Sequence, residues 1–207
     1  MKRATPAAIL LLFVACATSA PDRAAKAASS LEVMQQNSSK ARAQIDSVLS
    51  SLDALLDAPA ERLRETYDRY DSNVKKMNEY ADAIRENDRD LRSNGNTYLK
   101  QWQRDASDVS DPELRAIAEQ RRDQTARSME SMRATLTSAA GSFEAFLRDV
   151  NDIKKVIGND LTPTGQASVK QTAVAQSVHS EGERVKSSIY DAEQAIERFR
   201  SQITPTN

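Results

Sequence analysis

"LRETYDRYDSNVKKMNEYADAIRENDRDLRSNGNTYLKQW", residues 63–102, repeats apolar and aromatic residues in alternating steps of four and three. The alternation runs for eleven steps without interruption. A 3.5-residue repeat held this long predicts one helix that packs along a single seam in a left-handed supercoil. At 1.5 Å per residue, this helix would be about 60 Å long. The seam residues are Leu63, Tyr67, Tyr70, Val74, Met77, Ala81, Ile84, Asp88, Leu91, Gly95, Tyr98 and Trp102.

Similar spacing continues on both sides of this stretch, in one segment before it and two after it. Breaks near Pro59, at SDPELR (110–115) and at GNDLTPTG (158–165) separate the segments, and short connections force consecutive helices to run antiparallel. We therefore expect an all-α fold, an elongated up-down antiparallel helical bundle or coiled coil of about four long helices over residues 31–203. The remaining seam positions are Leu31, Met34, Ser38, Ala41, Ile45, Val48, Leu52 and Leu55; Leu114, Ile117, Arg121, Thr125, Ser128, Met132, Leu136, Ala139, Phe143, Phe146, Val150, Ile153 and Ile157; and Val174, Val178, Gly182, Val185, Ile189, Ala192, Ile196, Phe199 and Ile203.

Two of the breaks carry helix-start signals. Asp111 can cap a helix whose first position is Pro112, and Glu113 suits the positive end of the helix dipole. Gly158-Asn159 is a stop signal, and Thr162-Pro163 is a restart. These signals predict the boundaries of the last two long helices.

The composition agrees with a helical protein that is soluble over most of its length. Apolar residues make up 39% and charged residues 29% of the 207, and only five Gly and six Pro interrupt the helical pattern. The net charge of −1 comes from interspersed charges of both signs. No basic block indicates nucleic acid as a partner.

The N-terminus has a different character. Lys2 and Arg3 precede an apolar run of nine residues, 7–15, whereas a membrane-spanning helix needs about 20. A short apolar run behind a basic start is typical of an export signal.

The end of this run resembles a bacterial lipoprotein box, Phe13-Val14-Ala15-Cys16. The resemblance implies cleavage between Ala15 and Cys16 and acylation of Cys16, the only cysteine. It divides the chain into a lipoprotein signal peptide (1–15), a lipidated tether (16–30), the bundle domain (31–203) and a C-terminal tail (204–207). Ala17, where Asp would hold a lipoprotein in the inner membrane, implies the outer membrane, with the protein facing the periplasm.

Two alternatives stay open for this region. One is an ordinary signal peptide cut after Ala20, which would put Pro21 directly behind the scissile bond. The other concerns the tether, because Ala24, Ala27 and Ala28 could equally begin the first helix.

The body of the chain is similar to the bacterial family catalogued as domain of unknown function 2959. The similarity rests on YLKQWQRD (98–105), DPELR (111–115) and FEAFLRDVNDIKKVIGNDLTPTGQASV (143–169), although the family's His in the last turn is absent. It covers roughly residues 31–203. Members look like exported, often lipid-anchored helical proteins. The resemblance implies neither a catalytic residue nor a cofactor.

Residues that could carry chemistry are few. His179 is the only histidine, so no His-pair metal site or Ser-His-Asp triad can form within one chain, and we expect a partly exposed surface side chain. A calcium loop starting at Asp88 would need Gly at its sixth position and Glu at its twelfth, where the chain has Ser93 and Leu99. We therefore expect no catalytic, cofactor or metal site.

Two features of the seam need a structural explanation. Asp88 must either pair with a cation from a facing helix, for which Arg121 is a candidate, or remain accessible to water. Tyr67, Tyr70, Tyr98 and Trp102 form an aromatic row, which at helical spacing indicates core packing rather than a ligand platform.

These observations favour a non-enzymatic, lipid-anchored periplasmic helical bundle with a structural or protein-interaction role at the cell envelope. Its expected partners are the membrane, through acyl chains on Cys16, and an envelope protein or a second copy of itself. The alternative is a membrane-shaping or lipid- or small-ligand-binding helical protein. Membrane shaping would need a basic face, which the interleaved charges do not provide.

Overall fold

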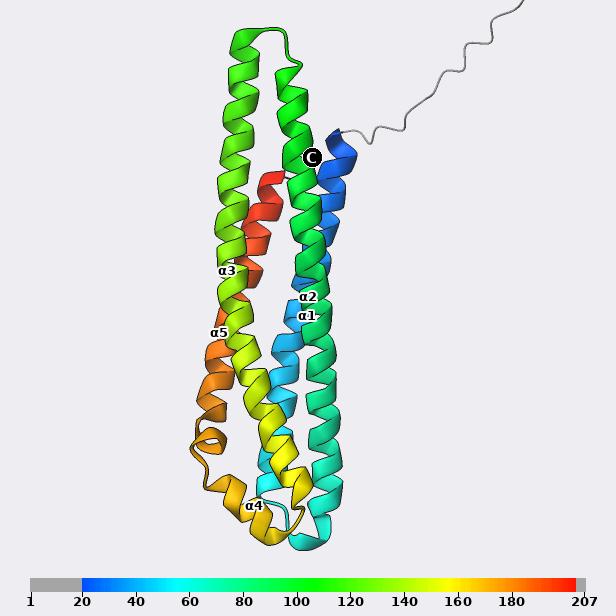
Figure 1. Cartoon of the computed structure of the whole chain (residues 1–207), viewed down its shortest axis with the longest axis vertical. Coiled ribbons are helices and arrows are strands. Elements are labelled where there is room, and N and C mark those ends of the chain that lie inside the picture. Colours follow the sequence, from blue (N-terminus) through cyan, green and yellow to red (C-terminus); the bar gives the residue numbers. More distant parts are fainter. Residues whose placement is uncertain (1–19, 204–207) are drawn as a thin grey trace, which may run out of the picture.

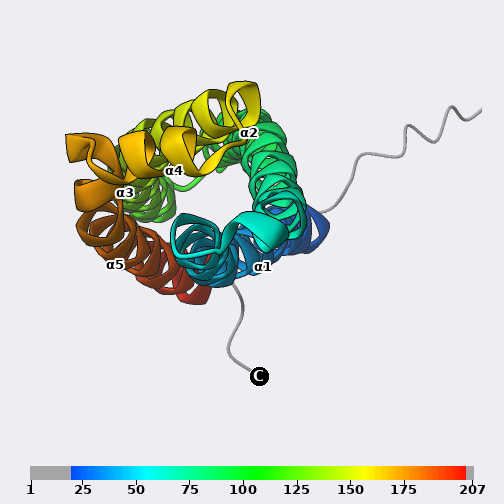
Figure 2. The ribbon, with the colours of Figure 1, turned by 90° about the horizontal axis from the view of Figure 1, so that it is seen from below.

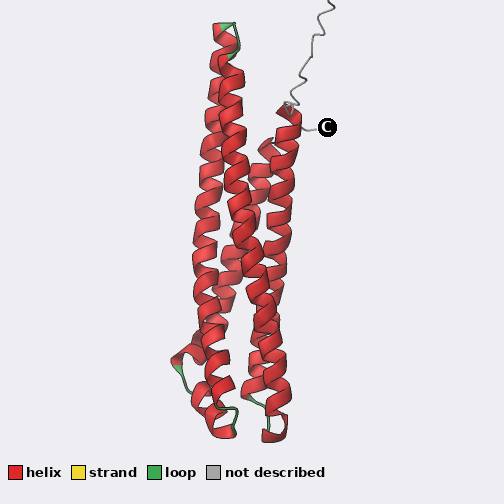
Figure 3. Cartoon of the chain, turned by 45° about the vertical axis from the view of Figure 1, so that its right-hand side comes forward, coloured by secondary structure: helices red, strands yellow, loops and turns green. Residues whose placement is uncertain are grey.

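The computed structural model describes residues 20–203, with side chains from Ala24 onward. Four long helices dominate this range: α1 (Ala20–Leu56), α2 (Leu63–Ser107), α3 (Pro112–Asn159) and α5 (Ala173–Ile203). A short 3-10 helix, η1 (Ala60–Arg62), joins α1 to α2, and α4 (Pro163–Lys170) lies between α3 and α5. Within residues 20–203 there is no β-strand (Figure 3), which confirms the predicted all-α class.

The four long helices form an elongated bundle in which each runs antiparallel to the one before it (Figure 1). α1 and α3 each pack against both α2 and α5, so the helices follow one another around a ring (Figure 2). We call the two ends of the bundle the α4 end, which α4 crosses, and the hairpin end, where α2 turns into α3. α1 begins and α5 ends toward the hairpin end (Figure 1). The predicted up-down antiparallel bundle is therefore confirmed.

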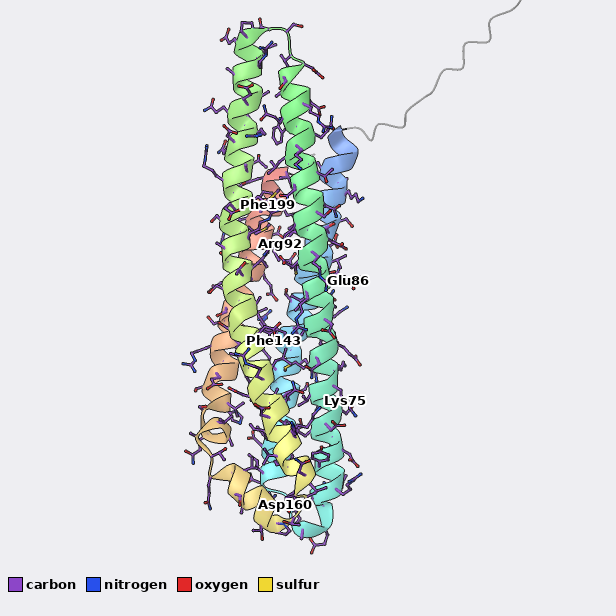
Figure 4. All side chains as sticks on the ribbon, viewed as in Figure 1. Lys75, Glu86, Arg92, Phe143, Asp160 and Phe199 are labelled. Carbon is purple, nitrogen blue, oxygen red and sulfur yellow. The ribbon has the colours of Figure 1, made fainter. Side chains whose placement is uncertain are left out.

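The interior consists of the seam residues. All eight seam positions predicted in α1, from Leu31 to Leu55, are buried. The buried residues form a larger apolar cluster toward the α4 end and a smaller one toward the hairpin end. Figure 4 shows one phenylalanine of each, Phe143 in the larger cluster and Phe199 in the smaller, whereas Lys75 and Glu86 lie on the outer surface.

Hydrogen bonds to buried carbonyl groups add specificity to the larger cluster. The Tyr70 hydroxyl donates to the Val150 carbonyl oxygen at 2.8 Å, and burial raises the pKa of this phenol. Gln166 Nε2 of α4 donates to the carbonyl oxygens of Leu55 (2.7 Å) and Ala58 (3.0 Å), which ties α4 to the end of α1. Tyr70 and Gln166 thus bury their polar groups with partners, and a buried polar group without a partner costs free energy.

The helix starts follow the sequence signals. The Asp111 side chain accepts hydrogen bonds from the backbone N–H groups of Glu113 (3.0 Å) and Leu114 (2.9 Å), and Thr162 Oγ1 accepts one from Gly165 (3.1 Å). The restart at Thr162, however, begins the short helix α4 rather than the last long helix. A second break follows Lys170, and Thr172 Oγ1 then accepts from the Ala175 N–H at 3.2 Å as α5 begins.

The bundle begins earlier than the boundary at residue 31. α1 starts at Ala20, so the part of the predicted tether over residues 20–30 is helical, as the alternative reading allowed. Alanine has the highest helix propensity, and Ala27 is buried in the smaller cluster, which gives this segment something to pack against. The remaining tether, residues 16–19, lies outside the described residues, as do the predicted signal peptide (1–15) and tail (204–207).

The seam prediction is wrong for the first turns of α3 and α5. Leu114, Ile117 and Arg121 of α3 are exposed, and so is Val174 of α5. The periodicity of α3 is correct, but α5 ends before it reaches the first turns of α3, so α5 does not cover Leu114, Ile117 and Arg121 (Figure 1). Val174 lies in the first turn of α5, at the α4 end of the bundle. The stripe becomes buried at Thr125.

Two glycines provide a matched test of the packing. A Cβ atom added at Gly182 of α5 would lie 2.8 Å from Leu49 Cδ1 and 3.2 Å from Ile45 Cγ2, whereas one at Gly141 of α3 would meet nothing within 4 Å. We expect Gly182→Leu to lower the free energy of unfolding by about 2 kcal/mol through overpacking. We expect Gly141→Ala to raise it by about 0.5–1 kcal/mol through helix propensity. Urea unfolding followed by circular dichroism measures both, and equal stability of the two variants would contradict the packing.

Candidate interaction sites

Neither a metal-binding cluster nor a membrane-spanning helix is found among the residues that the structure describes. Among the described residues, no cluster of three or more His, Cys, Asp or Glu side chains is arranged to hold a metal ion. Over the same residues, no helix combines the length and the apolar character needed to cross a membrane. The surface features of the described residues include a groove between α1 and α5, a groove between α3 and α5 beside Asp149, and the exposed tip of the α2–α3 hairpin.

The groove between α1 and α5 combines charged and aromatic groups. Lys186 Nζ lies 2.7 Å from Asp46 Oδ1 of α1 and 2.7 Å from Glu183 Oε1 of α5. Hydrogen bonds to Asp46 and then to Glu183 hold the pKa of Lys186 above its ordinary value. Tyr190 lines the same groove and is 49% exposed. It is the one aromatic residue among those that line the groove.

One wall of this groove contains an ion pair whose carboxylate is buried and whose guanidinium is partly exposed. Arg42 Nη2 of α1 lies 3.2 Å from Glu193 Oε2 of α5, and the Arg42 guanidinium lies 5.7 Å from the centre of the Tyr190 ring. Glu193 is only 6% exposed. Burial raises the pKa of its carboxyl, and Arg42 opposes that rise. Arg42 therefore contacts the face of the Tyr190 ring and also compensates the buried charge of Glu193.

Replacing Arg42 with alanine should destabilise the bundle by about 2 kcal/mol at pH 7. Removing one partner of a fully buried pair costs about 3–5 kcal/mol, and partial solvent exposure of Arg42 reduces this figure. Chemical denaturation of Arg42→Ala and of the unchanged protein measures the difference. Arg42→Ala combined with Glu193→Leu should regain stability, because no carboxylate then remains buried.

The same pair sets a pH dependence. The folded pKa of Glu193 is raised, so the folded state binds a proton more tightly than the unfolded state and this carboxyl lowers stability as pH rises through its pKa. Without Arg42 the pKa rises further, so Arg42→Ala should recover part of its lost stability when the pH falls from 7 to about 5. A loss that is the same at both pH values would contradict this role of Glu193.

The groove between α3 and α5 contains two carboxylates in contact. Burial, and then the hydrogen bond to Glu181, raise the pKa of Asp149. Glu181 Oε1 also accepts a hydrogen bond from Ser177 Oγ at 2.8 Å. The nearest cation to this oxygen is Arg184 Nη2 of the same helix, at 4.0 Å. The contact between Asp149 and Glu181 joins α3 to α5 at this groove.

The hairpin tip, which we define as residues 102–121, is held in place although no other helix packs on it. Arg115 Nε and Nη2 both donate to the Val109 carbonyl oxygen, at 2.9 and 2.7 Å, which closes the turn. Tyr98 and Trp102 of α2 form an edge-to-face pair with ring centres 5.6 Å apart. Leu114 and Ile117 are 59% and 52% exposed and, three residues apart on α3, lie on one face. The tip therefore presents apolar side chains on a fixed backbone.

The predicted seam pairing of Asp88 is wrong. Asp88 Oδ2 pairs with Arg92 Nε of the same helix at 2.7 Å, and Arg121 is exposed, with Nη1 donating to Gln124. Water reaches Asp88, which was the other alternative. His179 is exposed and lies 2.7 Å from Asp53 Oδ1, in agreement with the predicted surface position.

The aromatic row divides between core and surface. Tyr70 is fully buried, as core packing predicts, and Tyr67 packs against the larger cluster. Tyr98 and Trp102 are half-buried near the hairpin end. Of the row, Tyr70 therefore belongs to the larger cluster and Tyr67 packs against it.

The Arg42–Glu193 pair was not found in the sequence. A usable signal existed, because each residue directly follows a seam position, Ala41 and Ala192. Positions beside a seam are where coiled coils place interhelical ion pairs. A periodic pattern alone cannot say which of the many such charges meet.

Ala15 and Cys16, the predicted cleavage and lipid-attachment residues, lie outside the described residues, so their roles stay predictions. Comparison with known proteins addresses the rest of the chain. No curated protein and no solved structure matches it. Residues 24–199 match the family described as protein of unknown function, DUF2959, which confirms the resemblance noted in the sequence. The chain therefore belongs to the DUF2959 family.

Proposed function

We propose that this protein is a non-enzymatic, lipid-anchored bundle that stands on the outer membrane, faces the periplasm and serves a structural or protein-interaction role. The observation that carries the proposal is the start of α1 at Ala20, four residues after Cys16. Acyl chains on Cys16 would hold one end of the bundle close to the bilayer. α3 has 48 residues and is about 72 Å long, so the other end would reach far into the periplasm.

The groove between α1 and α5 is the surface that best fits a protein partner. Tyrosine and arginine are the residue types enriched in the energetic centres of protein interfaces. Tyr190 is exposed, and Arg42 holds its ring in place, so little side-chain entropy is lost on binding. The ion pairs of Lys186 would form a polar rim around this centre.

Photo-crosslinking in intact envelopes tests the interaction role. A photoreactive phenylalanine placed at Tyr190 should give a defined product, and the same residue at the exposed Lys76 on α2 provides the control. The mass of the product distinguishes a second copy of this chain from another envelope protein. Equal yields at the two positions, or no product at Tyr190, would argue against the groove as an interface.

A further inference from the structure

The apolar face of the hairpin tip has no part in the proposed function. Leu114 and Ile117 are among the most exposed large apolar side chains of the described residues, and both lie at the hairpin end. The occupant of such a face depends on what lies near that end of the bundle.

The register of α1 against α2 fixes how far the tip projects. Asn94 Nδ2 of α2 donates to Ser30 Oγ of α1 at 3.2 Å, so these residues lie at the same level of the bundle. Ala20 is ten residues before Ser30, about 15 Å away along the axis, and Ser107 is thirteen residues after Asn94, about 20 Å in the same direction. The end of α2 therefore lies about 5 Å beyond the start of α1.

The length of chain before α1 then limits the distance to the bilayer. Three residues lie between Cys16 and Ala20, so four Cα–Cα steps join them and can span at most about 14 Å. The Cys16 sulfur could thus lie no more than about 9 Å beyond the end of α2 along the axis. A headgroup layer is itself about 5–8 Å thick, so an upright bundle anchored through Cys16 brings its tip to the membrane surface.

We infer that Leu114 and Ile117 of the hairpin tip contact the lipid bilayer and form a second, non-covalent membrane attachment beside the acylated cysteine. The inference rests on the proposed function, because it requires the anchor at Cys16. A weak contact is sufficient, since the anchor holds the tip at a high effective concentration near the surface.

The net charge of the tip indicates which kind of lipid surface it would bind. The tip, residues 102–121, carries five acidic and three basic side chains, a net charge of −2. An acidic segment is repelled by an anionic surface, so the contact fits a zwitterionic surface. The charged residues of the tip are Arg104, Asp105, Asp108, Asp111, Glu113, Arg115, Glu119 and Arg121.

Site-specific fluorescence on the lipidated full-length chain tests the inference. Cys16 is the only cysteine, and acylation blocks its thiol, so Ile117→Cys introduces one reactive site for an environment-sensitive dye. Val156→Cys is the matched control, because Val156 is 56% exposed on the same helix but lies toward the α4 end. In phosphatidylcholine nanodiscs that hold one copy each, nitroxide-labelled lipids should quench the dye at 117 several-fold more than at 156.

Flotation of the same samples separates the possible failures. Equal quenching at 117 and 156 in protein that floats with lipid would overturn the membrane contact and leave the anchor intact. Protein that does not float would refute the proposed anchor itself. The dye at 117 could report an apolar environment in vesicles that hold many copies but not in nanodiscs that hold one. That result would show that a second copy covers this face, and it would overturn the lipid contact.

Discussion

Replacing residues 1–16 with a cleavable export signal that lacks a lipoprotein box is expected to move the protein from the membrane fraction to the soluble periplasmic fraction. The change removes Cys16 and leaves every described residue in place. Each buried methylene contributes about 0.8 kcal/mol, and two or more acyl chains together make attachment effectively permanent. Fractionation of envelopes with high salt and then detergent, followed by immunoblotting, measures the distribution.

The control for this experiment is the thermal stability of the released protein. Because the bundle begins at Ala20, the melting temperature should match that of the detergent-solubilised, acylated protein. A released protein with unchanged stability would show that attachment and folding are separate. Retention of the altered protein in the membrane fraction after a salt wash would contradict an anchor that depends on Cys16.

Phe146→Ala is expected to lower the free energy of unfolding by about 3–5 kcal/mol. Phe146 is 1% exposed and lies in the larger apolar cluster, where its ring would contact a Cβ atom placed at Gly182. Truncating a buried aromatic side chain loses its transfer free energy and leaves a cavity that helices can fill only in part. For a protein of this size, the corresponding fall in melting temperature is roughly 10 °C.

Val156→Ala provides the matched control for Phe146→Ala. Both residues lie on α3, but Val156 is exposed, so its truncation should change stability by less than about 0.5 kcal/mol. Urea unfolding of the two variants at one pH makes the comparison. Similar losses for the two would mean that α3 does not face the core with the residues assigned here.

Most of this fold could be predicted from the periodicity of the sequence. The spacing of apolar residues along the chain shows directly which face of a helix is buried. The alternation from Leu31 to Leu55 and from Leu63 to Leu91 identified the inward faces of α1 and α2 correctly, apart from partial exposure at Tyr67, Ile84 and Asp88. The caps at Asp111 and Thr162 were also visible, since capping depends on neighbouring residues.

The exposed hairpin tip and the Arg42–Glu193 pair could not be predicted from the sequence, because both depend on the relative lengths and offsets of the helices. The seam of α3 continues to Leu114 whether or not another helix faces it, so periodicity could not show that the tip is exposed. Arg42 and Glu193 are 151 positions apart, and only the packing of α1 on α5 brings them together. Candidate surfaces therefore required the structure, whereas the anchor at Cys16 was inferred from a local motif.

The proposed lipid anchor depends directly on the chemical state of the mature N-terminus. Mass spectrometry of the N-terminal peptide, released by protease from the protein purified from its native membranes, measures this directly. The proposed anchor predicts a peptide that begins at Cys16 and carries the mass of diacylglycerol and an amide-linked acyl chain. An unmodified peptide that begins at Pro21 would contradict it.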